Sequence, residues 1–300
     1  MKILSIILVL CASQHLFGDF LRLPNHQERS VRQDAPLNNP FWDNSTKMFW
    51  FFGTEHLWIW GTKSNSLKKL THPDFKNRRF VIFAANNIFV ATNKKILVIN
   101  QTEKTVTNLY DSPLSAIVGM HRERHSIIVT SDKHVLIINP HDLSFQKTDH
   151  TQVVESSSYY IHNHFWFFSE SLGVIKEEGK SKLLSCGARP QSPRILEASI
   201  VQYCQNKFYR FAPNGRLIQV IPNVGQHAAI AWSFQPNVHS FLYDNKILEV
   251  FNLKKNQKES YLLNNKLSQF LFDKQILAGL TNDFPVLELL TNPVETTMLH

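Results

Sequence analysis

A short apolar strand recurs seven times along this chain, and the spacing of the copies constrains the fold more than any other feature. Successive copies begin 39, 39, 38, 43, 32 and 36 residues apart. Most copies are rich in Phe, Ile, Val and Trp, which favour extended backbone. The copies begin at Phe49, Ile88, Ile127, Phe165, Phe208, Ser240 and Ile276.

The second repeat shows how each copy is embedded in a larger unit. Its four strand-like runs are separated by short polar segments and cover residues 80–84, 88–92, 96–100 and 105–109. Asn86-Asn87 separates the first two runs, and Asn suits such turns because it tolerates positive φ. Four short strands joined by tight turns predict an antiparallel meander. A period near 40 residues built from meanders is typical of a β-propeller.

The sequence therefore predicts an all-β fold, a single β-propeller of about seven four-stranded antiparallel blades. Six or eight blades stay open, because the first repeat has no clear first strand before Phe49 and the fourth-to-fifth step is long. Either residues 39–42 supply the missing strand, or the C-terminal residues 294–299 pair across the junction.

The second repeat also resembles a known class of propeller repeat. Ile88–Asn93, followed by Ile96–Asn100 and Thr105–Thr107, is similar to the YVTN repeat, within the broader WD40-like type. The resemblance covers this unit well and the other units loosely. It implies the fold and no activity. The Gly-His and Trp-Asp pairing of WD40 repeats is absent from the sequence.

Three segments differ in composition. Residues 1–18 read as a signal peptide, with Lys2 ahead of an apolar stretch and small residues after it, so we predict a secreted, extracellular protein. Residues 19–40 are polar and lack apolar periodicity, which predicts a flexible leader containing the Arg29–Arg32 form of a processing site. Residues 41–300 form the propeller domain. No other segment is apolar over the length that a membrane span needs.

Modification sites fit a secretory protein. Asn44 and Asn100 begin Asn-X-Thr sequons, which predict glycosylation at strand edges or loops. Cys186 and Cys204 remain once the signal segment is removed, and an even count in an oxidising compartment indicates one disulfide. The repeat register, however, places the two cysteines in different repeats, and a disulfide requires Cα atoms within about 7 Å. The pairing therefore stays open.

The chain is basic, with a formal charge of +8 that includes Lys2. Its cationic residues are scattered and form no stripe that would bind nucleic acid. Two long loops between repeats are nevertheless basic and lie where propellers bind partners. We therefore predict an acidic partner surface, on an extracellular protein or an acidic glycan. The partner-binding candidates are Arg78, Arg79, Arg189 and Arg194.

Histidine is enriched in the middle of the chain, with seven of 14 between positions 121 and 164. Imidazole binds zinc or copper and titrates near neutral pH. Five of these side chains fall on loops that a propeller would bring to one face: His121, His125, His141, His162 and His164. They are the metal-ligand candidates, against the alternative that they are solvated loop residues. No Cys or acidic residue is spaced to complete a site, so we predict no cofactor.

Catalytic motifs are absent from the sequence, including a Gly-x-Ser-x-Gly elbow and an Asp-rich calcium loop. We therefore expect a secreted, non-enzymatic binding or scaffold protein of an extracellular matrix, coat or fluid. The alternative is an extracellular metal-assisted hydrolase or a lactonase-like propeller enzyme, since propellers host both classes. No sequence feature indicates an oligomeric state.

Overall fold

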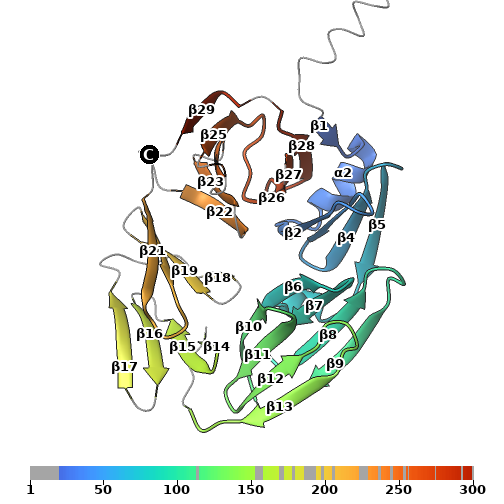
Figure 1. Cartoon of the computed structure of the whole chain (residues 1–300). Helices are drawn as coiled ribbons and strands as arrows, with labels where there is room; N and C mark the ends of the chain where they lie inside the picture. Colours follow the sequence, from blue (N-terminus) through green and yellow to red (C-terminus); the bar gives the residue numbers. More distant parts are fainter. Residues whose placement is uncertain are drawn as a thin grey trace, which may run out of the picture. The chain divides into compact units, whose positions relative to one another are not determined.

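The computed structural model describes residues 20–112, 115–152, 158–168, 172–177, 180–185, 194–196, 199–204, 207–222, 229–235, 238–243, 246–252, 255, 257–273, 275–291 and 293–298 (Figure 1). The chain divides into two compact units. One unit comprises residues 1–71 and 229–300, and the other comprises residues 72–228.

Among its described residues, the unit 72–228 contains four sheets, each of four antiparallel strands in sequence order (Figure 1). A short 3-10 helix, η2 (Phe75–Asn77), precedes them. The strands are β6 (Phe80–Ala84), β7 (Asn87–Ala91), β8 (Lys95–Asn100) and β9 (Val106–Asp111); β10 (Ile117–Glu123), β11 (Ser126–Ser131), β12 (His134–Ile138) and β13 (Phe145–Asp149); β14 (Ser158–Ile161), β15 (His164–Phe168), β16 (Leu172–Glu177) and β17 (Lys180–Ser185); and β18 (Arg194–Leu196), β19 (Ser199–Cys204), β20 (Lys207–Phe211) and β21 (Leu217–Pro222).

The other unit contains three sheets among its described residues. Their strand orders are β2-β3-β4-β5, β22-β23-β24-β25-β29 and β1-β28-β27-β26. The elements are β1 (Phe20–Arg22), α2 (Asn25–Arg32), β2 (Asn38–Asp43), β3 (Met48–Phe52), β4 (His56–Gly61), β5 (Ser66–Thr71), β22 (Ala229–Gln235), β23 (Val238–Tyr243), β24 (Ile247–Asn252), β25 (Gln257–Leu262), β26 (Gln269–Asp273), β27 (Ile276–Leu280), β28 (Pro285–Leu289) and β29 (Glu295–Met298).

Burial explains why the inner strands are apolar along their whole length. Every residue of β7 is buried, whereas every residue of β13, at the edge of the next sheet, is exposed. Side chains from the sheets β6–β9 and β10–β13 form one apolar cluster, which includes Phe89 and Ile127. An inner strand is therefore covered on both faces, and its sequence does not alternate.

These features confirm the predicted all-β fold of four-stranded antiparallel sheets. Six of the seven recurrent apolar segments lie on the second strand of the meander in their sheets. The fifth, Phe208–Phe211, lies instead on β20, the third strand of its sheet, because the short strand β18 precedes β19 there. The hairpin turns use the expected chemistry: Asn86 and Asn163 both adopt positive φ. Asn adopts positive φ at a low energetic cost, because its short polar side chain can form local hydrogen bonds in that conformation.

The structure resolves the two alternatives for the first repeat. β2 supplies the first strand, and Phe41 pairs with Trp50 of β3. The C-terminal strand β29 instead adds a fifth strand beside β25, where Met298 pairs with Gln257. Both elements lie in the unit that contains the two ends of the chain.

Residues 20–40 differ from the flexible leader that their composition predicts. β1 completes the sheet of β26–β28 through the pair Leu21 and Leu287 (Figure 1). The helix α2 buries Val31 completely, in a core cluster that also contains Leu23 and Leu37. Three apolar side chains are therefore enough to anchor a segment whose other residues are mostly polar. The Arg29–Arg32 processing motif lies on this helix.

A buried carboxylate anchors the end of this segment. Asp34 accepts hydrogen bonds from the backbone N–H of Glu55 at 2.7 Å and from Trp58 Nε1 at 2.8 Å. The Nδ1 atom of His56 lies 3.1 Å from the same carboxylate. A Cβ on Gly53 would lie 2.0 Å from Asp34 Oδ2, so only glycine lets the carboxylate approach so closely. Asp34 thus joins the segment after α2 to β4.

We expect Asp34→Ala to lower the free energy of unfolding by about 2–4 kcal/mol, because it leaves buried N–H donors without an acceptor. Urea denaturation followed by circular dichroism would measure the change. Asp149→Ala is the matched control, since the Asp149 side chain is 80% exposed and should matter little. Equal stability of Asp34→Ala and Asp149→Ala would contradict the anchoring role.

Candidate functional site

A polar recess lies in the unit 72–228, beside two of the predicted partner-binding residues. It encloses about 680 Å³, and Arg79 is one of its walls. The recess forms where the segment before β6 meets the turn between β7 and β8. Its lining residues are Asp74, Asn77, Arg79, Thr92, Asn93, Lys94 and Lys95.

Arg79 is held in place by the neighbouring strand connections. Its Nη1 atom donates hydrogen bonds to Asn93 Oδ1 at 3.0 Å and to the carbonyl oxygen of Ile117 at 2.9 Å. Its guanidinium also lies 5.5 Å from the centroid of the Phe80 ring. These contacts orient the cation and reduce the entropy that it would lose on binding an anion.

Arg78 has a more local role. Its Nη1 atom donates to the carbonyl oxygen of Phe75 at 2.7 Å, across the 3-10 turn η2. Arg78 therefore stabilises the turn that precedes the recess. Arg79 is the one of the pair that lines the recess.

Two lysines from the β7–β8 turn add charge to the recess. Thr92 Oγ1 accepts the backbone N–H groups of Lys94 and Lys95, at 3.2 and 3.0 Å, and so fixes the turn. Lys95 Nζ pairs with Asp74 Oδ2 at 3.1 Å. The Lys94 side chain is exposed. Three cationic side chains and one carboxylate thus share the recess, which favours a negatively charged partner.

Lys94, Lys95 and Asp74 were not among the partner-binding residues expected from the sequence. The signal that could have found them is topological: the β7–β8 turn and the segment before β6 lie at the same end of a meander. Arg189 lies outside the described residues, and only the backbone of Arg194 is described, at the start of β18. Partner binding by Arg189 and Arg194 stays a prediction.

Two of the five predicted metal-ligand histidines meet at a carboxylate. Glu123 ends β10, and His121 lies two residues earlier on the same strand, with its Nε2 atom 3.5 Å from Glu123 Oε2. The backbone N–H of His162 donates to Glu123 Oε2 at 3.2 Å, and His162 Nδ1 also bonds to the carboxylate. His162 comes from the turn between β14 and β15, so the cluster joins two neighbouring sheets.

Burial and the histidines set the charge of this cluster. Burial alone would raise the pKa of Glu123, but its interactions with His121 and His162 outweigh that effect and lower the pKa from 4.5 to about 2. Burial also lowers the pKa of His121, which Glu123 offsets only in part. The cluster therefore holds an ionised carboxylate beside a buried imidazole that resists protonation.

The remaining histidine candidates do not join this cluster. His125 and His141 are exposed, and His164 begins β15. Across the part of the chain that the structure describes, no group of three or more His, Cys, Asp or Glu side chains could hold a metal ion. The arrangement thus favours a hydrogen-bonded clamp between sheets. Sequence reasoning missed Glu123, which lies inside the predicted histidine loop.

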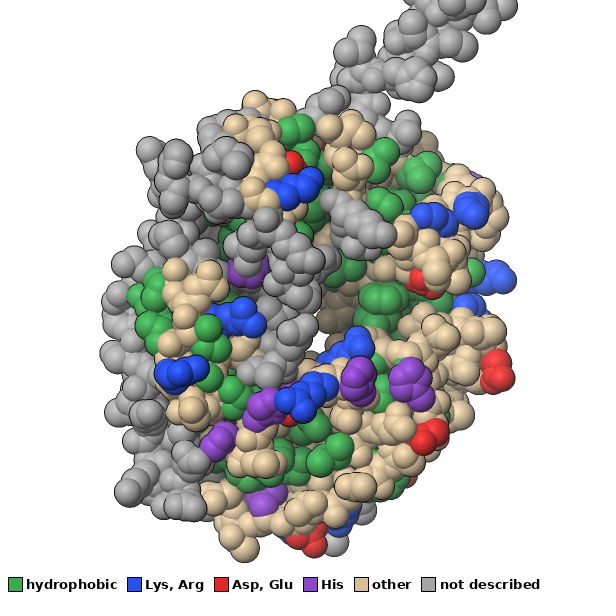
Figure 2. All heavy atoms as spheres, viewed as in Figure 1, with side chains coloured by type: hydrophobic (Ala, Val, Ile, Leu, Met, Phe, Trp, Pro, Cys, Tyr) green, Lys and Arg blue, Asp and Glu red, His purple; other side chains and the backbone are tan. Residues whose placement is uncertain are grey.

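Histidines and cations share one face of the unit 72–228. Figure 2 shows histidine, lysine and arginine side chains close together over the sheets β6–β9 and β10–β13. An acidic partner would therefore be sought on this face.

The predicted glycosylation sites lie in a turn, for Asn44, and at a strand end, for Asn100. Asn44 follows β2, and its Oδ1 atom accepts a hydrogen bond from Lys47. Asn100 ends β8, and its Oδ1 atom accepts the backbone N–H of Thr102 at 2.8 Å. Glycosylation of both stays a prediction.

The disulfide between Cys186 and Cys204 stays a prediction. Cys186 lies outside the described residues, and only the backbone of Cys204 is described, at the end of β19. The predicted signal peptide at residues 1–18 also lies outside the described residues. Among the helices that are described, none is long and apolar enough to cross a bilayer.

Comparison with known proteins identifies the fold through structure rather than sequence. No protein-family profile matches the chain, and no curated protein is significantly similar to it. BBS1N, solved in complex with ARL6DN, is similar with a TM-score of 0.56 and 13% identity, covering 91% of this chain and 94% of that chain.

Two further solved structures support the same conclusion. A chain of the mitotic checkpoint complex has a TM-score of 0.57 and 8% identity, covering 92% of each chain. Hsv2 of Kluyveromyces lactis has a TM-score of 0.51 and 12% identity, covering 89% of this chain and all of that chain. At such identities the likeness shows the fold alone. It confirms the resemblance to WD40-like β-propeller proteins.

The depressed pKa of Glu123 predicts a pH-dependent contribution to stability. A carboxylate with a lower pKa in the folded state stabilises the fold above its unfolded pKa, near 4.5. That contribution falls as the pH decreases toward 2. We expect Glu123→Gln to lower the free energy of unfolding at pH 7 by about 1–3 kcal/mol, and the deficit to narrow below pH 4.5.

Thermal unfolding of both proteins between pH 7 and pH 3 would measure this dependence. Glu103→Gln is the matched control, because Glu103 is exposed in the turn after β8 and should leave the profile unchanged. A deficit for Glu123→Gln that stays constant across this pH range would refute the assignment.

Proposed function

We propose that this protein is a secreted, non-enzymatic binding module that engages an acidic protein or an acidic glycan through the recess around Arg79. The observation that carries the proposal is the convergence of Arg79, Lys94 and Lys95 on one open space of about 680 Å³. A fixed guanidinium beside two lysines suits carboxylate or sulfate groups.

The solved propellers give a precedent for binding. BBS1N was solved in complex with ARL6DN, and another of the similar chains belongs to the mitotic checkpoint complex. By analogy, this chain would also present its loops to a partner. The extracellular location rests on the sequence of residues 1–18 and on the two sequons. No observation within the described residues favours a metal-assisted hydrolase or lactonase.

Binding to heparin oligosaccharide, used as an acidic glycan probe, tests the recess directly. We expect Lys94→Glu to weaken binding by about 2–10-fold at 0.15 M salt, because reversing one exposed charge removes an attraction and adds a repulsion. Isothermal titration calorimetry or surface plasmon resonance would measure the dissociation constant. Lys94 is exposed and should tolerate the change without unfolding.

Lys68→Glu is the matched control, because Lys68 is exposed on β5 and does not line the recess. Both variants change the net charge equally, so general attraction to a basic protein would weaken binding equally in both. Equal losses would show that the recess is not the binding site. An acidic protein partner would be tested with the same pair of variants after capture from extracellular fluid.

A further inference from the structure

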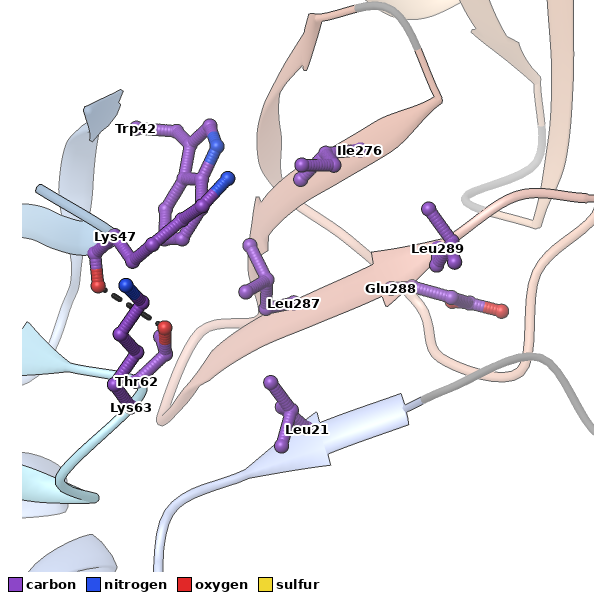
Figure 3. A pocket seen from close by; sticks show the side chains of 9 residues that line it. All are labelled: Leu21, Trp42, Lys47, Thr62, Lys63, Ile276, Leu287, Glu288 and Leu289. Carbon is purple, nitrogen blue, oxygen red and sulfur yellow. Dashed lines mark hydrogen bonds between the residues drawn. The ribbon is translucent and has the colours of Figure 1, made fainter. Parts of the chain in front are cut away.

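A second opening lies in the unit that contains the two ends of the chain. It encloses about 340 Å³ between the sheet β1-β28-β27-β26 and the sheet β2–β5 (Figure 3). These two sheets share an apolar core that includes Trp42, Leu287 and, at its margin, Ile276. The opening is therefore the point at which this core reaches the surface.

One wall is a continuous aliphatic surface created by strand register. Leu21 pairs with Leu287 between β1 and β28, and Ile276 pairs with Leu289 between β27 and β28. Directly paired residues lie on the same face of a sheet, as do residues two apart. All four side chains therefore line the pocket together. Leu21 is 44% exposed, so this wall is accessible from solvent.

Trp42 of β2 forms the opposite wall. Figure 3 shows its indole ring facing Ile276 and Leu287 across the opening. Trp42 is only 5% exposed, yet no described group accepts a hydrogen bond from its Nε1 atom. A buried indole N–H normally has an acceptor. A ligand oxygen next to the Trp42 ring would supply this missing acceptor. Because the Nε1 atom is buried, the indole would have to shift slightly to reach the ligand.

Positive charge is concentrated at one end of the pocket. Lys47 Nζ lies 6.0 Å from the Trp42 ring, and Thr62 Oγ1 donates to the Lys47 carbonyl oxygen at 3.0 Å (Figure 3). Lys63 is exposed beside them and forms no ion pair with any described residue. This end of the pocket is therefore suited to an anionic head group.

The one acidic lining residue does not oppose this arrangement. Glu288 lies between Leu287 and Leu289 on β28, and successive side chains of a strand point to opposite faces of the sheet. Its side chain therefore points away from the face that carries the aliphatic wall. Its Oε1 atom accepts a hydrogen bond from Asn264 Nδ2 at 3.0 Å. Burial raises the pKa of Glu288, and the hydrogen bond from Asn264 offsets this effect only in part.

We propose that this pocket binds a free medium-chain fatty acid, with the carboxylate at Lys47, Lys63 and Trp42 and the alkyl chain along Leu21, Leu287 and Leu289. A pocket of this volume falls within the range of small-molecule sites. Each buried methylene contributes about 0.8 kcal/mol. The aliphatic wall offers no polar side chain to a peptide backbone, whose N–H and C=O groups would lose their partners.

A second copy of this chain fits the pocket less well. Two copies meeting at this face would bring Lys47 and Lys63 of one toward the same lysines of the other. Like charges at an interface are unfavourable. An alkyl carboxylate instead brings the complementary charge together with apolar surface.

Titration of the full chain with decanoate below its micelle concentration tests the proposal. Calorimetry should show saturable binding of one decanoate per chain. Leu21→Glu should weaken it at least tenfold, because the change places a carboxylate on the aliphatic wall. Leu262→Glu is the matched control, since Leu262 is 64% exposed on β25, does not line the pocket and should leave binding unchanged. Circular dichroism of both variants would verify their folding.

A second pair of variants tests the head group independently. Lys63→Ala should weaken decanoate binding by about two- to fivefold and leave binding of uncharged 1-decanol unchanged. Lys68→Ala, on β5 outside the pocket, should affect neither ligand.

Two results would overturn the proposal. One is the absence of saturable decanoate binding, or equal binding by Leu21→Glu and Leu262→Glu. The other is a concentration-dependent dimer in sedimentation velocity that Leu21→Glu abolishes, which would assign the pocket to a second copy of the chain.

Discussion

The pairing of β1 with β28 is the constraint on which the unit containing both chain ends depends. It joins residues 20–22 to residues 286–288 and covers an edge of β28 that would otherwise expose unpaired backbone groups. The pairing also places Leu23 and Val31 in the core between two sheets. Without this long-range contact, β28 would be an edge strand and the aliphatic wall of the pocket would lose Leu21.

Two buried or partly buried carboxylates organise the polar contacts in their respective units. Asp34 accepts hydrogen bonds from backbone and indole N–H groups at β4 and the turn before it. Glu123, at the end of β10, interacts with the side chain of His121 and accepts a hydrogen bond from the backbone of His162. In both cases a charge can leave water because several donors surround it. Their roles differ from that of the recess around Arg79, where cations remain accessible and a partner would supply the opposite charge.

Sequence reasoning found the strands and part of the sites. The seven apolar segments could be located because short strands with Asn-containing turns are local patterns, as in the hairpin at Asn86. The leader was misread because three apolar residues, Leu23, Val31 and Leu37, do not create periodicity within a polar segment. Arg79 was predicted as a partner-binding residue because it lies in a long basic loop. Lys94 was not predicted, because it lies in the turn between β7 and β8, which only the fold brings to the same recess.

The sequence by itself determined most of the strands, their antiparallel connections and the likeness to a propeller repeat, because each depends on neighbours within about 40 residues. Only the tertiary structure decided which residues meet across greater distances in the chain. Leu21 pairs with Leu287 between two strands that are far apart in the sequence. His162 donates a hydrogen bond to Glu123 across two neighbouring sheets. Such pairs have no local signature, since identical side chains elsewhere in the chain remain in solvent.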